Sequence, residues 1–129
     1  MPAMDRLLWI CLAGAAGTGT RYLVGVWAAE RFGVTFPLGT LVVNLAGCFL
    51  MALIVEAAFR SAWPETVRLA LTAGYLGGLT TYSSFNFEAT RLIETGAAGT
   101  AGAYAVATLI GAFAAGWAGL ALARALFSA

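Results

Sequence analysis

Residues 74–88 read Gly-Tyr-Leu-Gly-Gly-Leu-Thr-Thr-Tyr-Ser-Ser-Phe-Asn-Phe-Glu, and they lie in the third of four long apolar runs. A Gly pair at 77–78, followed by two β-branched threonines, is a poor helix former. Backbone groups released by such a break inside a membrane must be bonded by protein, water or an ion. The stretch therefore predicts a membrane helix that is broken near its middle, at residues 77–80, beside an ion path.

The four apolar runs each have about the 20 residues that a helix needs to span a bilayer. They cover residues 7–28, 37–58, 68–92 and 100–122, and the connections between them are short. No connection is long enough for a separate folded domain, so we expect residues 1–129 to form one transmembrane domain. The sequence predicts an all-α membrane protein with four transmembrane helices.

The composition supports a lipid environment and argues against several functions. Only 10% of the 129 residues are charged, against about 25% in soluble domains. The net charge of +1 offers no basic surface for nucleic acid. The chain has no histidine, the commonest general base and metal ligand, and no nucleophile paired with a base. We therefore expect a protein that is not an enzyme.

The arginines near the span ends bear on orientation. With an even number of spans, both termini lie on one side of the membrane. That side would hold Arg6, Arg60, Arg68 and Arg124. The other side would hold Arg31 and Arg91, with Arg21 near it inside the first span. Four arginines against two or three is a small difference for the positive-inside rule. A single orientation and a dual topology, in which copies insert both ways, both remain open.

Polar side chains at membrane depth are costly and are usually functional or paired. Thr40 and Asn44 lie four residues apart, on one face of the second span. The two amide N–H donors of Asn44 either join helices or bind an anion. Tyr104 and Thr108 share this spacing in the fourth span and either bond locally or extend a polar track. Arg21, in the first span, either reaches the interface or gives a vestibule a positive charge.

The residues after the third-span break form a polar face and an aromatic pair. Thr81, Ser84 and Glu88 share one face at helical spacing, and Tyr82 and Phe85 lie beside it. Glu88 either faces an ion at the end of a pore or pairs with an arginine three residues later. In a purely structural interpretation, the glycines form a kink for packing and the aromatic rings fill a groove. The adjoining hydroxyls favour a pore instead.

Three motifs together resemble those of the Fluc (CrcB-type) fluoride channels. They are Gly-Thr-x-x-x-Asn at 39–44, Gly-Gly-x-Thr-Thr-aromatic-Ser at 77–83 and Thr-Arg-Tyr at 20–22. The resemblance covers essentially the whole chain, including its length and span count. It implies an antiparallel, dual-topology homodimer in the cell (inner or plasma) membrane. It also implies two pores, each built from both subunits, through which fluoride leaves the cytoplasm passively.

The resemblance also implies roles for single residues. Asn44 corresponds to the family's pore asparagine, and Tyr82 and Phe85 correspond to its aromatic box. A structural Na⁺ at the dimer centre would be held by the backbone carbonyls of Gly77 and Thr80 from both subunits. The implied hydroxyl track consists of Thr40, Ser83, Ser84, Tyr104 and Thr108.

The chain departs from the family pattern at three positions. Tyr82 stands where phenylalanine is usual, but a tyrosine ring still presents an electropositive edge. Ser84 stands where threonine is common and keeps a hydroxyl. Ala112 stands where the family often has another hydroxyl, which leaves the extent of the track open.

Two alternatives come from other classes of membrane protein. A small multidrug-type transporter needs a carboxylate inside its first span, and residues 7–28 contain no Asp or Glu. A non-transporting assembly subunit of a membrane complex would use the same polar residues only for packing.

Overall fold

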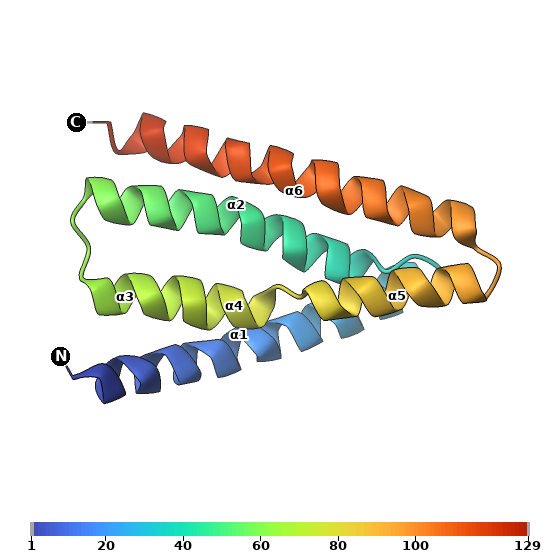
Figure 1. Ribbon diagram of the computed structural model, residues 1–129, viewed down its shortest axis with the longest axis horizontal. Coiled ribbons are helices and arrows are strands. Elements are labelled where there is room, and N and C mark those ends of the chain that lie inside the picture. Colours follow the sequence, from blue (N-terminus) through green and yellow to red (C-terminus); the bar gives the residue numbers. More distant parts are fainter. Residues whose placement is uncertain (1, 129) are drawn as a thin grey trace.

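The computed structural model describes residues 2–128, which form a bundle of helices joined by short connections (Figure 1). Three helices are long and apolar enough to cross a membrane: α1 (Ala3–Phe32), α2 (Leu38–Arg60) and α6 (Ala98–Leu126). They lie at the first, second and fourth predicted spans and extend beyond most of the predicted ends. Both termini lie at the same end of the bundle, as an even number of passes requires (Figure 1).

The third predicted span is an interrupted helix. It consists of α3 (Glu65–Leu69), the π-helix η1 (Ala70–Leu76), α4 (Gly77–Leu79) and α5 (Tyr82–Glu94). In Figure 1 these segments follow one another along the length of the bundle. The expected broken third helix is thus present, whereas the π-helix before the break was not predicted.

The interruption lies at Thr80 and Thr81, whose backbone angles are extended (φ −87°, ψ 155° and φ −154°, ψ 123°). The sequence predicted that the break begins at the Gly pair, which is wrong, because Gly77 and Gly78 are helical in α4. Gly78 instead allows a close approach to α1, since a Cβ there would collide with the Gly14 carbonyl oxygen. The threonines end the helix, and the glycines bring it against its neighbour.

Small residues bring the helices together in two tight pairs. Gly17 of α1 lies so close to Tyr75 of η1 that an added Cβ would overlap the Tyr75 carbonyl. Gly119 of α6 meets the backbone carbonyl of Phe49 in α2 in the same way. Such contacts are the usual means of helix association in lipid, where apolar surface alone gives no driving force. The pairs α1 with η1–α4 and α2 with α6 therefore make the scaffold of the bundle.

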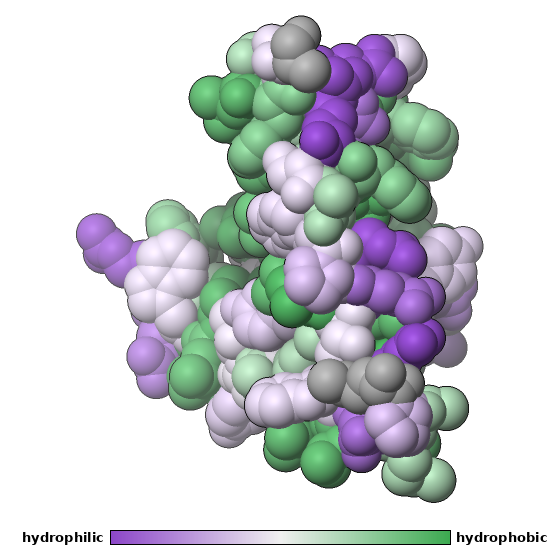
Figure 2. Space-filling view, turned by 90° about the vertical axis from the view of Figure 1, so that its left-hand side faces the viewer, coloured by the Kyte–Doolittle hydropathy of each residue, from purple (hydrophilic) through white to green (hydrophobic). Residues whose placement is uncertain are grey.

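The outer surfaces and the two ends differ in character. Large apolar side chains are exposed along α1 and α6, among them Leu8, Trp27 and Trp117, as expected for helices that face lipid. Figure 2 views the end that carries both termini, where hydrophilic side chains gather toward one side. Ion pairs at this end join Arg6 to Glu65 at 2.7 Å and Arg60 to Glu56 at 2.8 Å.

Candidate functional site

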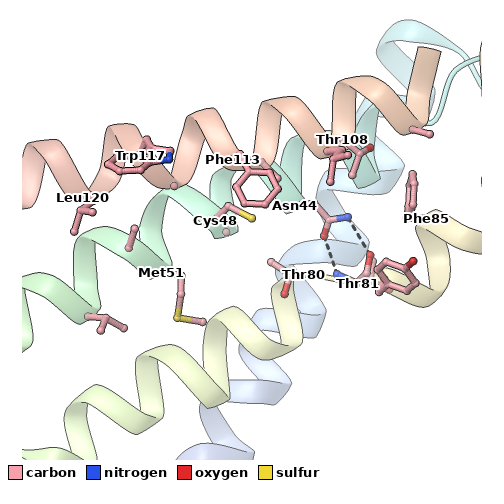
Figure 3. Close-up of a pocket in the computed structure, with 18 of the residues that line it drawn as sticks. Asn44, Cys48, Met51, Thr80, Thr81, Phe85, Thr108, Phe113, Trp117 and Leu120 are labelled. Carbon is pink, nitrogen blue, oxygen red and sulfur yellow. Dashed lines mark hydrogen bonds between the residues drawn. The ribbon is translucent and has the colours of Figure 1, made fainter. Parts of the chain in front are cut away.

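The break in the third span is held by a two-point clamp from α2. The Thr81 N–H donates to Asn44 Oδ1 at 2.8 Å, and Asn44 Nδ2 donates to the Thr81 carbonyl at 3.0 Å (Figure 3). Both groups of the Asn44 amide therefore bond the main chain that leaves the helix. One of its two N–H donors is used in this way, so a second N–H remains for a ligand.

Thr81 also starts α5. Its Oγ1 accepts the Ser84 N–H at 3.1 Å, which is the bond that a helix N-cap makes. The Ser83 and Ser84 hydroxyls lie 3.3 and 3.1 Å from the same Thr81 Oγ1. Neither serine lines the groove described next. These two members of the predicted hydroxyl track therefore lie around the cap.

A groove of about 1050 Å³ runs between α2, the break and α6. Four predicted site residues line it close to the break: Asn44, Tyr82, Phe85 and Thr108. Away from the break its lining becomes apolar, with Met51, Phe113, Trp117 and Leu120 (Figure 3). The described lining contains no arginine, and its one charged residue is Glu56 at the far end.

Thr108 lines this groove, and its hydroxyl has no hydrogen-bond partner among the described residues. Its Oγ1 is buried and makes no hydrogen bond among the described residues. A buried hydroxyl left unbonded costs about 1–3 kcal/mol, and such groups are rare unless a ligand or water completes them. Thr108 is therefore a polar residue of the groove lining whose donor is not used by the described part of the chain.

An aromatic row leads from the groove into the bundle. The Tyr82 and Phe85 rings are 5.8 Å apart, Phe85 and Tyr104 are 5.0 Å apart, and Tyr104 and Phe36 are 5.4 Å apart, all in edge-type contacts. Tyr82 is 79% exposed, whereas Tyr104 is fully buried. The expected pairing of Tyr82 with Phe85 is confirmed. Ring edges are electropositive, so edges that face the groove suit an anion.

A partly buried carboxylate, Glu88, lies beyond the aromatic row. Thr40 Oγ1 donates to Glu88 Oε1 at 2.6 Å, and the Tyr104 hydroxyl donates to Glu88 Oε2 at 3.0 Å. Arg91, the possible alternative partner of Glu88, pairs with Glu94 at 3.0 Å instead. Thr40 and Glu88 line a second cavity of about 270 Å³ at the α1–α2 connection. The predicted hydroxyl track is thus split, since Thr40 and Tyr104 bind Glu88 and Thr108 faces the groove.

Arg21 is directed at the break. Its Nε donates to the Gly78 carbonyl at 3.0 Å, and the residue is half-buried. Arg21 therefore bonds the last turn before the interruption. It lines neither the groove nor the second cavity.

The carbonyls of Gly77 and Thr80 both lose their helical donors at the break. In a continuous helix they would accept from Thr81 and Ser84, but these N–H groups donate to Asn44 Oδ1 and Thr81 Oγ1. The Thr80 hydroxyl donates to the Leu76 carbonyl at 2.9 Å, so it does not bond the carbonyl of Gly77 or of Thr80. Within residues 2–128, no cluster of three His, Cys, Asp or Glu side chains could hold a metal. Two carbonyls without helical donors nevertheless fit a hard cation such as Na⁺.

Two residues with structural prominence were not among the predicted site residues. Thr81 is central to the clamp and the cap, and its position before two serines is the signal of an N-cap. Phe36 ends the aromatic row from a loop. A single phenylalanine before a proline carries no signal of such a contact, because its partner lies 68 positions along the chain.

Comparison with known proteins gives one consistent result. Residues 8–120 match the family model described as CrcB-like protein, Camphor Resistance (CrcB). A protein of Anaeromyxobacter dehalogenans is 51% identical over 94% of this chain and 97% of its own length. Proteins of Citrifermentans bemidjiense (45%; 95% of this chain, 100% of theirs) and Agrobacterium fabrum (46%; 96% and 100%) are also similar. All three relatives are named fluoride-specific ion channel FluC.

Proposed function

Because the chain belongs to the CrcB-like family, we propose that it is a passive, fluoride-selective channel of the cell membrane that lets fluoride leave the cytoplasm. Members of this family are ion channels and not enzymes. An inside-negative potential favours the exit of an anion by about 2.3 kcal/mol per 100 mV, so no energy-coupling domain is needed.

The observation that carries the proposal is the set of unused donors at one end of the groove. The Thr108 hydroxyl is buried and unbonded within residues 2–128, the Asn44 amide retains one N–H, and Phe85 lines the same groove. Fluoride is small and strongly hydrated, so a narrow pore must replace the hydrogen bonds of its water shell. Conduction also requires sites weak enough to release the ion, and the described groove lining contains no arginine that would trap it.

An antiparallel homodimer with two pores is the assembly that suits this groove. The groove is open on one side, and Phe113 and Trp117 on its rim are 67% and 68% exposed. A second copy would close it, and an antiparallel arrangement would close one such groove on each subunit. The small arginine difference between the two ends supports insertion in both directions.

A structural Na⁺ at the dimer centre fits the same arrangement. The carbonyls of Gly77 and Thr80 would hold it, and the ion would fix the break in both subunits. Arg21 donates from α1 to the Gly78 carbonyl, so it would hold α4 against α1.

The small multidrug-type alternative gains no support from the fold. The acidic residues of α1 are Asp5 and Glu30, and each lies within three residues of an end of the helix. The partly buried carboxylate of Glu88 belongs to α5 and accepts hydrogen bonds from two hydroxyl groups.

Reconstitution in liposomes tests the proposed function. Vesicles loaded with potassium fluoride and treated with a potassium ionophore should release fluoride quickly, as an ion-selective electrode would record. The same vesicles loaded with chloride should release it no faster than protein-free vesicles. Equal release of both anions, or no release of fluoride, would overturn the proposal.

A further inference from the structure

Phe36 ends the aromatic row from outside the helices. It lies in the connection between α1 and α2, and its ring meets the Tyr104 ring at 5.4 Å and 66°. The Phe85 ring contacts the same Tyr104 ring at 5.0 Å and 75°. Tyr104 is therefore held by two phenylalanines, one from α5 and one from this connection.

The aromatic row joins two separate cavities. Tyr82 and Phe85 line the groove, Phe36 lines the second cavity, and the two linings share no residue. Tyr104 lines neither cavity and is fully buried between them. Glu88 stands on the second-cavity side, with one carboxylate oxygen bonded to the Tyr104 hydroxyl. Tyr104 and Glu88 therefore link the residues of the groove lining to those of the second cavity.

The backbone fixes Phe36 at this place. Gly33 ends α1 with φ +82°, a conformation that favours glycine, and turns the chain back toward α2. The Leu38 N–H donates to the Phe36 carbonyl at 2.8 Å, which tightens the turn before α2. Gly39 packs against Gly25 of α1 so closely that a Cβ would lie 2.9 Å from the Gly25 Cα. The connection is thus anchored on both sides of the phenylalanine.

We propose that Phe36 is a positioning residue for ion passage, which holds the Tyr104 hydroxyl on Glu88 where the path opens into the second cavity. The inference rests on the proposed function. An anion that approaches the second cavity meets a carboxylate whose two oxygens are covered by hydroxyl donors. Without the Phe36 ring, Tyr104 can turn away and leave one oxygen bare, and a bare carboxylate repels the anion.

The first test compares flux per reconstituted channel. Phe36→Leu keeps apolar bulk but removes the ring edge, and it should lower fluoride flux about two- to tenfold, the range that one aromatic contact supports. Phe36→Tyr keeps the ring and should restore at least half of the flux. The matched control is Phe32→Leu, because Phe32 makes an edge contact with Trp27 at the same end of α1 but lines neither cavity. Unchanged flux in Phe36→Leu, or an equal loss in Phe32→Leu, would overturn the inference.

A double substitution separates positioning from general packing. In Tyr104→Phe the hydroxyl is absent, so Phe36→Leu should cause little further loss of flux in that background. Independent effects would multiply instead. A multiplied loss would show that Phe36 does not act through the Tyr104 hydroxyl and would overturn the proposal.

A third measurement tests the second cavity without disturbing the ring. Val34 lines this cavity and is 84% exposed, so Val34→Cys should leave the fold intact. In a chain with Cys11 and Cys48 replaced by alanine, a negatively charged thiol reagent at position 34 should slow fluoride flux. The same reagent on Phe32→Cys should not. Full labelling at position 34 without a change in flux would exclude this cavity from the path.

These outcomes are distinct from failure of the proposed function. The unsubstituted protein in fluoride-loaded vesicles tests the function, and the ratio of each variant to it tests Phe36. If the unsubstituted protein conducts fluoride and Phe36→Leu conducts equally well, the proposed function stands and the inference about Phe36 is overturned.

Discussion

At the level of single residues, substitution of Thr108 should affect stability and fluoride flux in different ways. Its hydroxyl is buried and unbonded, so Thr108→Val should leave stability unchanged or raise it by about 1 kcal/mol, because an unsatisfied polar group is removed. Fluoride flux should fall, because the groove loses a donor. Thermal unfolding in detergent and flux in liposomes would measure the two effects.

The matched control for this substitution is Thr72→Val. Thr72 is also buried, but its hydroxyl donates to the Arg68 carbonyl at 2.8 Å and lies outside the groove. This variant should lose some stability and keep its flux per channel. If Thr108→Val destabilised the protein and conducted normally, Thr108 would be a packing residue.

Glu88 illustrates what residue spacing could not decide. The sequence left two interpretations for this carboxylate, one of which was an ion pair with Arg91. In the structure Arg91 pairs with Glu94, which is equally close along the helix and exposed like Arg91. The donors to Glu88 come from α2 and α6, which lie 48 and 16 positions away in the sequence. Local spacing identified the competing arginine but not these distant partners.

At the level of elements, the clamp between α2 and the break is open to direct test. Asn44→Asp replaces the donor to the Thr81 carbonyl by a carboxylate oxygen, so a bond becomes a repulsion and a negative charge enters the groove. Fluoride flux should fall to the level of protein-free vesicles, as the liposome assay would show. Asn86→Asp makes the same chemical change on an exposed residue outside both cavities and should conduct normally. Normal conduction in Asn44→Asp would remove the amide from the path.

The helices themselves were largely predictable, because a membrane imposes one length and one polarity on each span. The apolar runs located α1, α2 and α6, and the threonines located the break to within one turn. The π-helix η1 was not predictable from hydropathy, since a change of hydrogen-bond register leaves the apolar pattern nearly unaltered. The clamp was also missed as a contact, because Asn44 and Thr81 are 37 positions apart.

At the level of the whole molecule, the proposed dual topology predicts labelling at both membrane faces. Met4 is 72% exposed near the N-terminal end of α1. Met4→Cys, in a chain with Cys11 and Cys48 replaced by alanine, should react with an impermeant thiol reagent in about half of the copies in intact cells. Permeabilised cells should show complete reaction.

Val34→Cys reports on the opposite end of the bundle and serves as the control. In a dual topology it should also react in about half of the copies. Complete reaction at one position and none at the other would establish a single orientation and contradict the antiparallel dimer.

The number of residues in the π-helix η1 affects more than the length of the third span, because it also affects the direction in which the following segment faces. Each residue of an α-helix turns the chain by about 100°, and a π-helical stretch accommodates about one residue more per turn than an α-helix does. Gly74 and Gly78 both face α1 across this stretch, so its wider coil sets the rotational phase of everything that follows. Loss of one residue within 70–76 would let this stretch close into an ordinary α-helix, so Thr80 and Thr81 would keep their direction toward Asn44. Gain of a further residue that the wide turn cannot absorb would instead rotate the break by about 100°.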